Sequence, residues 1–332
     1  MLFLHSIGHF HPDNILDNDF LESLDIGVDR QWIADRVGIE RRRTVLPLDY
    51  IRNTRNRDPR EAVEYAAYSN EDTAVRASGC ALLRAGIDAS DIGMVIAGGC
   101  SPESTLPAEA CRVAAALGIT APAFDLNAGC VSFIAQLHFL SHWQESALPD
   151  FVLIVNPENN TRTVDYANRK VAVLWGDGTT AAIVSTRLKG PGRISNTHFL
   201  ADPSGWRLAR TPTGGHFWQD GHAVQSFAVR RTTEMFQLAQ GKFGGDRRPS
   251  YVIGHQANLR MLESACRRAN IPANQHLSCV ADFGNCGAAG APSVLSMHWE
   301  TLITGSRVAL GVVGAGLCWG SLQIDFSEAH HK

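Results

Sequence analysis

Two spacings of apolar residues alternate along the chain and predict a succession of strands and helices. Short apolar runs bounded by polar or glycine residues predict strands at 2–7, 92–97, 121–126, 151–156, 251–254, 307–313 and 317–324. Apolar residues three or four positions apart predict helices at 17–24, 29–36, 61–85, 108–117, 131–143, 224–243, 259–268 and 292–302. Residues 46–60, rich in Arg and Asp and containing prolines, predict a polar connection. This alternation is typical of an α/β fold.

The order of elements in the first half of the chain recurs in the second half. The matching segments are Val95-Ile96 with Val252-Ile253, the turn at Cys130 with the turn at Asn285, and a hairpin at Gly176-Asp177-Gly178 with one at Gly314-Ala315-Gly316. A chain of 332 residues is long enough for two subdomains, so we predict an N-terminal half at 1–188 and a C-terminal half at 189–332. Because ligands of α/β proteins usually bind where strand ends meet, we expect the two turns to face each other at a shared interface.

The stretch Asp125-Leu126-Asn127-Ala128-Gly129-Cys130-Val131-Ser132-Phe133 places Cys130 between a predicted strand and a predicted helix. The free N–H groups and the positive dipole end of a helix N-terminus stabilise an anion. A thiolate in such a position has a pKa lowered from about 8.5 to roughly 3.5–7.5. The small residues before Cys130 leave room for a substrate carbonyl at the sulfur. The alternative interpretation is a buried structural cysteine, the commonest role of a free cysteine.

Two further residues complete a candidate site. His255 follows a predicted strand, and Asn285 lies in a turn of small residues. A cysteine with a histidine is an arrangement for nucleophilic catalysis on an acyl group, and histidine and asparagine together can stabilise an enolate or an oxyanion. Taken singly, His255 is also compatible with a core histidine and Asn285 with an ordinary turn residue. Their order on matching elements of a repeated plan favours the catalytic interpretation.

Composition limits the function classes. The chain is 45% hydrophobic and 19% charged, and its net charge of −3 gives no reason to expect nucleic-acid binding. The eight cysteines are scattered, without a CxxC pair or a zinc-like spacing, which favours reduced thiols in a cytoplasmic protein and no metal site. No run of about 18 apolar residues is present, so we expect no membrane span.

Several motifs together resemble the thiolase-like superfamily and, within it, the type III β-ketoacyl-(acyl carrier protein) synthases that start fatty-acid synthesis. The motifs are the Cys130 stretch, Gly254-His255-Gln256-Ala257-Asn258-Leu259-Arg260, Phe283-Gly284-Asn285, Trp175-Gly176-Asp177-Gly178, Gly314-Ala315-Gly316-Leu317-Cys318-Trp319-Gly320, and the N-terminal residues 32–42. The resemblance covers nearly the whole chain. It implies a thiolase-like five-layer αβαβα fold built from two duplicated αβ halves, and a homodimer.

The resemblance also implies roles for individual residues. The catalytic set would be Cys130, His255 and Asn285. The cysteine would take an acyl group from an acyl-coenzyme A or acyl-carrier-protein thioester. The other two would support decarboxylation of malonyl-(acyl carrier protein), whose carbanion attacks the acyl-enzyme. No cofactor is implied, since both thioesters are substrates. The implied substrate contacts are Trp32, Arg36 and Arg169 for coenzyme A, Arg260 for the carrier protein, and His222, Asn258, Leu106 and Gly316.

Some positions depart from the family pattern. Residues 46–64 resemble an insertion, and His222 stands where many members have Asn beside the pantetheine. Leu106 replaces a Phe that many members insert from the partner subunit, and Cys286 replaces a usual Thr. These departures indicate a specialised relative with a different acyl donor, in fatty-acid or secondary metabolism. Two alternatives remain open: an acyltransferase that passes the acyl group to a hydroxyl or amine, and a silent partner subunit of a ketosynthase pair.

Overall fold

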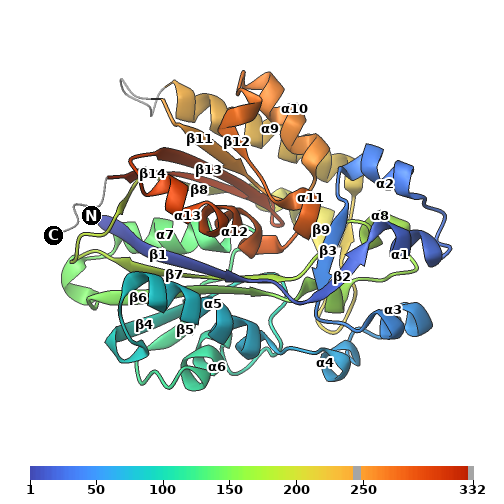
Figure 1. The fold of residues 1–332 in the computed structure, drawn as a ribbon, viewed down its shortest axis with the longest axis horizontal. Helices are drawn as coiled ribbons and strands as arrows, with labels where there is room; N and C mark the ends of the chain where they lie inside the picture. Colours follow the sequence, from blue (N-terminus) through green and yellow to red (C-terminus); the bar gives the residue numbers. More distant parts are fainter. Residues whose placement is uncertain (242–247, 328–332) are drawn as a thin grey trace.

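The computed structural model describes residues 1–241 and 248–327, and in it two sheet halves join edge to edge (Figure 1). Within these ranges, ten strands pair in the order β12-β11-β13-β14-β8-β1-β7-β6-β4-β5. The strands are β1 (Leu2–Phe10), β4 (Ile92–Ala97), β5 (Ala123–Asp125), β6 (Phe151–Glu158), β7 (Gly178–Ser185), β8 (Gly192–Ala201), β11 (Tyr251–Gly254), β12 (His276–Leu277), β13 (Arg307–Gly314) and β14 (Cys318–Phe326). The halves join where Leu2–Leu4 of β1 pair with Gly192–Ile194 of β8.

Helices cover both outer faces and fill the space between the sheet halves. The longer helices are α2 (Arg30–Val37), α5 (Asn70–Ala85), α6 (Glu109–Ala116), α7 (Ser132–His142), α9 (Gly221–Gln240), α10 (Leu259–Arg268) and α12 (Gly290–Met297). Helices α5 and α6 cover one outer face and α9 and α10 the other, while α7 and α12 lie between the halves (Figure 1). The layers therefore run helix, sheet, helix, sheet, helix, as expected for the thiolase-like αβαβα fold.

The middle layer forms the main hydrophobic core. Phe133 and Leu137 of α7 and Leu295 of α12 are almost fully buried in one cluster with Leu4 of β1 and Leu310 of β13. Since these residues come from both sheet halves, burial of the two middle helices fixes how the halves face each other. The predicted boundary between residues 188 and 189 stays a prediction.

Parallel strand pairs bring three connections to the same region. In the N-terminal half, Ala97 at the end of β4 pairs with Asp125 at the end of β5. In the C-terminal half, Gly254 at the end of β11 pairs with Gly311 of β13. Because side-by-side parallel strands end at one sheet edge, the residues after β4 and after β5 converge. The connection after β11 reaches the same region from the other half, since His255 there hydrogen-bonds Cys130.

Several predicted elements need correction. The predicted helix at 61–85 is two helices, α4 (Ala62–Tyr65) and α5, because Ser69 and Asp72 form a capping box that starts α5 anew. The polar connection at 46–60 contains α3 (Leu48–Thr54). The predicted helix at 292–302 begins earlier and is divided into α12 and α13 (Trp299–Leu302). The last two residues of the predicted helix 224–243 lie outside the described residues.

The hairpin predicted at Gly176-Asp177-Gly178 is also wrong. These residues follow the short α8 (Arg169–Ala172) and lead directly into β7, whose antiparallel partner β6 ends at Glu158. The Asp177 carboxylate is fully buried and accepts hydrogen bonds from the backbone N–H of Val45 at 2.7 Å and of Thr161 at 2.8 Å. The segment therefore anchors a long connection, and only the predicted turn at 314–316 is a hairpin, between β13 and β14.

The remaining elements were not predicted or are short. Strand β8 pairs with β1 and β14 but lacks a simple alternation of apolar residues, so the sequence pattern did not predict it. The helix predicted at 17–24 is confirmed as α1 (Asn18–Ser23). The others are β2 (Asn14–Asp17) paired with β3 (Arg41–Thr44), β9 (Ala209–Arg210) paired with β10 (Trp218–Gln219), and α11 (Val280–Phe283). Among the described residues, no helix combines the length and apolar character needed to cross a bilayer.

Candidate active site

The turn between β5 and α7 is held by its own side chains and carries Cys130 at its end. Asn127 Oδ1 accepts a hydrogen bond from the Gly129 N–H at 2.8 Å. Ser132 Oγ donates to the Gly129 carbonyl at 2.6 Å and accepts from the Ala128 N–H at 2.9 Å. Gly129 has a positive φ of 55°, which a glycine adopts without strain. The local sequence thus places Cys130 two residues before the first residue of α7.

The surroundings of Cys130 favour its thiolate. Its sulfur lies 3.4 Å from the sulfur of Cys100, and a hydrogen bond from that thiol contributes most to lowering the Cys130 pKa. Burial opposes this effect, while hydrogen bonding and charge from His255 support it, so the Cys130 pKa lies well below its ordinary value. The adjacent helix N-terminus acts in the same direction. Cys130 is 8% exposed, so the negative charge is held in a largely enclosed site.

Cys100 and Glu158 are site residues that the sequence analysis missed. Glu158, at the end of β6, is fully buried and accepts hydrogen bonds from the backbone N–H of Cys100 at 2.9 Å and of Ala288 at 2.6 Å. Burial, and then the Cys130 charge, raise the Glu158 pKa to about 8. The signal available from sequence was the position of Cys100 just after a strand, but only the pairing of β4 with β5 brings it to Cys130.

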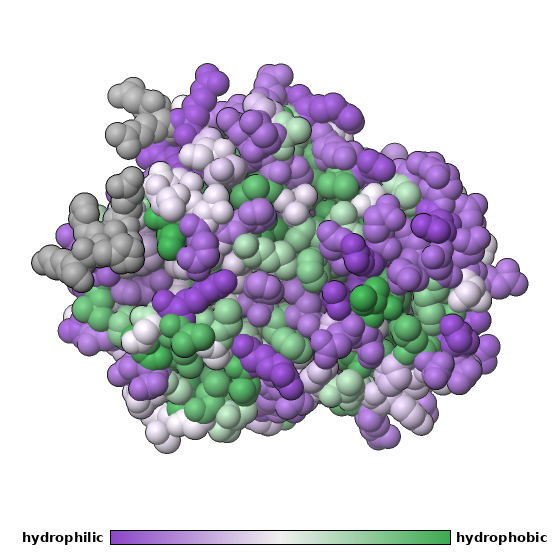
Figure 2. All heavy atoms as spheres, in the orientation of Figure 1, coloured by the Kyte–Doolittle hydropathy of each residue, from purple (hydrophilic) through white to green (hydrophobic). Residues whose placement is uncertain are grey.

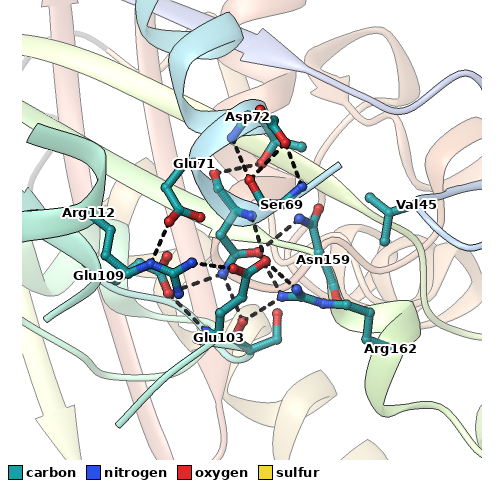
Figure 3. Close-up of polar contacts among 12 residues, drawn as sticks. Val45, Ser69, Glu71, Asp72, Glu103, Glu109, Arg112, Asn159 and Arg162 are labelled. Carbon is teal, nitrogen blue, oxygen red and sulfur yellow. Dashed lines mark hydrogen bonds and ion pairs between the residues drawn. The ribbon is translucent and has the colours of Figure 1, made fainter. Parts of the chain in front are cut away.

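A buried ionic network anchors the loop after β4. Figure 3 shows Glu103 between Arg112 and Arg162, with which it forms ion pairs. Arg162 also donates to the Ser101 carbonyl at 3.2 Å, as does the Asn70 amide at 3.0 Å. Buried, multiply bonded charges of this kind restrict a loop because every displaced partner would be left unpaired. The backbone on both sides of Cys100 is therefore tied down.

His255 lies at the end of β11, close enough to the Cys130 sulfur to affect its pKa. Its ring is 9% exposed, and among the described residues its Nδ1 atom has no hydrogen-bond partner. In particular, no carboxylate there orients the imidazole as a base. The next residue, Gln256, accepts hydrogen bonds from the backbone N–H of Cys279 at 2.9 Å and of Val280 at 3.2 Å, which fixes the start of the loop after β11.

Asn285 is held by long-range backbone contacts. Its N–H donates to the Leu174 carbonyl at 2.8 Å, and its carbonyl accepts from the Gly176 N–H at 3.1 Å. The side-chain Oδ1 accepts from the Gly287 N–H at 3.0 Å, which leaves the Nδ2 amide to act as the donor. Cys286 directs its thiol to the Phe283 carbonyl at 3.4 Å, within the same turn.

A cavity of about 990 Å³ lies between α2, α8, the start of α9 and the start of α10. Six predicted substrate-contact residues line it: Trp32, Arg36, Arg169, His222, Asn258 and Arg260. Asn285, 6% exposed, forms part of its inner wall. Figure 2 shows mostly hydrophilic side chains over the region of α2 and α10. The cavity thus connects a polar, cationic rim with a buried amide donor.

At the rim, two guanidinium groups lie over one indole. The Cζ atoms of Arg36 and Arg169 are 5.8 Å and 5.6 Å from the Trp32 ring centroid. Arg169 also donates to the Gly27 carbonyl at 2.7 Å. The aromatic face and the two cations are suited to an adenine ring and phosphate groups.

Other predicted contacts have structural partners of their own. Asn258 caps α10 by accepting from the Met261 N–H at 3.1 Å. Arg260 donates to the Ala34 carbonyl of α2 at 3.0 Å and pairs with Glu263 at 3.2 Å. Leu106 is 85% exposed, away from the cavity lining. Gly316 lies in the β13–β14 hairpin, whose Gly314 packs so closely on Cys130 that an added Cβ would be 3.4 Å from the Cys130 Cβ.

No set of three or more His, Cys, Asp or Glu side chains in the described part of the chain could hold a metal ion.

Comparisons with known proteins agree with this geometry. The family model described as 3-oxoacyl-[acyl-carrier-protein (ACP)] synthase III matches residues 124–203, and its C-terminal counterpart matches residues 248–326. Over 97% of this chain and 93% of the relative, the chain is 32% identical to β-ketoacyl-[acyl-carrier-protein] synthase III 2 of Streptomyces coelicolor. It is 31% identical to β-ketoacyl-[acyl-carrier-protein] synthase III of Syntrophomonas wolfei, over 95% of each chain.

A solved structure gives the same result for the fold. The 3-oxoacyl-[acyl-carrier-protein] synthase III of Aquifex aeolicus superposes with a TM-score of 0.86 and 26% identity, covering 98% of this chain and all of that one. The two family models include the Cys130 turn and both His255 and Asn285. The chain belongs to the β-ketoacyl-(acyl carrier protein) synthase III family of condensing enzymes.

Proposed function

We propose that Cys130 takes an acyl group from an acyl thioester and that the acyl-enzyme then condenses with malonyl-(acyl carrier protein). The Cys130 thiolate attacks the thioester carbonyl, and the donor thiol leaves. The malonyl thioester next loses CO₂, and the resulting carbanion attacks the acyl carbon, which releases Cys130. The β-ketoacyl product stays on the carrier protein, so no cofactor is consumed.

The observation that carries this proposal is the hydrogen bonding of two side chains, His255 beside Cys130 and Asn285 in the cavity wall. The Asn285 Oδ1 accepts from the Gly287 N–H, which leaves the Nδ2 amide of this cavity-lining residue as a donor. Among the described residues, His255 Nδ1 has no carboxylate partner that would orient the ring as a base, which leaves the imidazole to act as a hydrogen-bond donor. Two such donors suit the enolate oxygen formed during decarboxylation.

The same observation disfavours the acyltransferase alternative. Transfer to an alcohol or amine requires a base to take the acceptor proton, and such a histidine is usually oriented by a third polar group. The described surroundings of His255 offer no such group on Nδ1. The presence of Cys130, His255 and Asn285 together disfavours a silent partner subunit.

We propose coenzyme A thioesters as the donors. Arg36 and Arg169 supply charge for phosphate groups, and Trp32 supplies a stacking surface. The same cavity is lined by Asn285 but not by Cys130 or His255, so we propose that a pantetheine arm held at the rim extends past Asn285 to reach the thiol. Arg260 is exposed on α10 beside this rim and is the proposed contact for an acidic carrier protein.

We also propose a homodimer in which Leu106 contributes to the acyl pocket of the other subunit. Leu106 is an apolar side chain that is 85% exposed in the single chain. One exposed apolar side chain is ordinary on a protein surface, so this proposal rests on the resemblance of Leu106 to the family position that contacts the other subunit. The exchange of Phe for Leu, with His222 at the cavity wall, supports a donor other than that of the housekeeping enzymes.

Intact-mass analysis after exposure to a panel of acyl-coenzyme A and acyl-carrier donors tests the first half-reaction. Malonyl-(acyl carrier protein) is then added, and CO₂ and β-ketoacyl product are measured. We expect acylation of Cys130, CO₂ release and product formation. If the acyl-enzyme forms but only an added alcohol or amine discharges it, the acyltransferase alternative replaces condensation. If no donor acylates the protein, the silent-subunit alternative does.

A further inference from the structure

The loop after β4 places a second thiol against the proposed nucleophile. The sulfur atoms of Cys100 and Cys130 lie 3.4 Å apart, although the residues are 30 positions apart in sequence. Cys130 follows β5, and the pairing of Ala97 with Asp125 sets the two loops side by side. Neither thiol is part of a disulfide. The condensation reaction uses only one of them.

Three residues hydrogen-bond the loop that carries Cys100. The Cys100 N–H donates to Glu158, and the carbonyl of the next residue, Ser101, accepts from Asn70 and Arg162. Two glycines precede it, and an added Cβ at Gly98 would lie 2.4 Å from the Leu126 carbonyl. The contact between the sulfurs is therefore a property of the packed loop and not of one exposed, freely rotating side chain.

We propose that Cys100 and Cys130 form a reversible disulfide with a small-molecule disulfide as oxidant, and that this modification switches off acylation. The inference rests on Cys130 being the nucleophile assigned above. Bond formation shortens the sulfur–sulfur distance from 3.4 Å to about 2.0 Å, a movement within the range of side-chain rotation.

The reaction balances in two exchange steps. The Cys130 thiolate attacks one sulfur of the oxidant RSSR, which gives a mixed disulfide on Cys130 and releases RS⁻. The Cys100 sulfur then attacks the Cys130 sulfur, and a second RS⁻ leaves. The two cysteines lose two electrons and two protons, and the oxidant becomes two RSH. A dithiol reductant reverses both steps.

Glu158 provides a site for the proton of the resolving thiol. While Cys130 is a thiolate, its charge opposes ionisation of both Cys100 and Glu158. Capping of Cys130 in the mixed disulfide removes that charge. Loss of that charge favours ionisation of Glu158, which releases its own proton, and the resulting carboxylate, bonded to the Cys100 N–H, accepts the Cys100 proton. Cys130 and Glu158 thus keep Cys100 protonated while the Cys130 thiolate is free. Once Cys130 is in the mixed disulfide, the same surroundings favour attack of the Cys100 sulfur on it.

Mass spectrometry of the full chain with cystamine as the oxidant tests the proposal. Cystamine is slender enough to follow the route proposed for a pantetheine arm. The reduced protein is first acylated to confirm a working Cys130; failure at this step refutes the proposed function and not the disulfide. A second sample is treated with cystamine, quenched in acid, alkylated and digested.

In the wild type we expect the oxidised protein to be lighter than the reduced protein by two hydrogens for the Cys100–Cys130 pair. Digestion should give a cross-linked peptide joining Cys100 to Cys130. The oxidised protein should not be acylated until dithiothreitol is added. In Cys100→Ser the reaction is expected to end at the mixed disulfide, with one cysteamine bound to Cys130. Cys318→Ser is the matched control, because burial, and then the Cys130 charge, raise the pKa of this thiol, and the variant should still give the cross-link between Cys100 and Cys130.

A stable cysteamine adduct on wild-type Cys130 with Cys100 still open to alkylation would overturn the proposal. So would a cross-link from Cys130 to Cys318. If Cys100→Ser does not fold, the peptide map of the wild type decides alone.

Discussion

The two turns that lead into the middle helices are built from different kinds of contact. The Cys130 turn is held by Asn127 and Ser132, which lie within three residues of Cys130. The Asn285 turn is held by Leu174 and Gly176 and, through the Ala288 N–H, by Glu158, all more than 100 residues away. The nucleophile is thus placed by its own segment, whereas the amide donor is placed by the other half of the chain. Changes in packing should disturb the second turn first.

The largest loss of activity is expected from a change in the Cys130 turn. Cys130→Ala removes the thiolate that accepts the acyl group, so acylation should fall to background while the protein stays folded. Intact mass after donor treatment and circular dichroism measure the two quantities. Cys111→Ala, which changes an exposed cysteine, is the control and should acylate normally. Transfer of the label to Cys286 or Cys111 in the wild type would contradict the assignment.

A change in the Asn285 turn is expected to slow decarboxylation without affecting acylation. Asn285→Ala should still acylate at Cys130 but should decarboxylate malonyl-(acyl carrier protein) about 10²–10³-fold more slowly, since one oxyanion-type donor is lost. Acylation of the same sample is the internal control. Equal loss of both half-reactions would mean that the turn supports the nucleophile as well, and the contrast between the turns would fail.

The long-range support can be tested without touching a proposed catalytic group. An added Cβ at Gly287, which has a φ of 51°, would lie 2.4 Å from the Glu158 carboxylate. Gly287→Ala should lower the free energy of unfolding by about 1–3 kcal/mol and slow decarboxylation more than acylation. Gly118→Ala is the matched control, because its φ is 68° and nothing lies within 4 Å of its added Cβ. Urea unfolding and both half-reactions provide the measurements. If the two variants lose equal stability and activity, backbone strain alone explains the effect of Gly287→Ala, and contact with Glu158 does not.

The pH dependence of Cys130 tests the contact between the halves. Hydrogen bonding and charge from His255 lower the Cys130 pKa, so His255→Ala should raise it. The thiolate is the reactive form, and its alkylation by iodoacetamide should therefore have its pH midpoint at higher pH in the variant than in the wild type. An unchanged midpoint would assign the lowered pKa to Cys100 and the helix N-terminus alone.

The smallest effect is expected at the cavity rim, far from both turns. Arg36→Ala or Arg169→Ala should raise KM for a coenzyme A donor several-fold, roughly 1 kcal/mol of binding, with a smaller change in kcat. Arg30→Ala on the same helix is the control, because Arg30 pairs with Asp19 and does not line the cavity. If KM is unchanged in both rim variants, the donor is bound to a carrier or enters elsewhere.

The apolar run at 121–126 and the helical spacing of apolar residues at 131–143 were sufficient to place Cys130 at a helix start from the sequence alone. The contacts that build this turn lie within a few residues of it. Likewise, the apolar run at 251–254 predicted the strand before His255, and the small residues around Asn285 predicted the turn there. Helix interruptions such as the one before Ser69 were missed because a capping box starts a new helix after a short break that contains no proline or glycine.

Tertiary structure alone decided which of these groups meet. Cys100 and Glu158 belong to the site only because β4 lies beside both β5 and β6, and nothing in their neighbouring residues encodes that pairing. The protonation of Glu158 and the thiolate character of Cys130 also depend on burial and on charges brought from both halves. Local geometry can be inferred from short-range sequence, but contact between distant groups depends on the packing of the two sheets against α7 and α12.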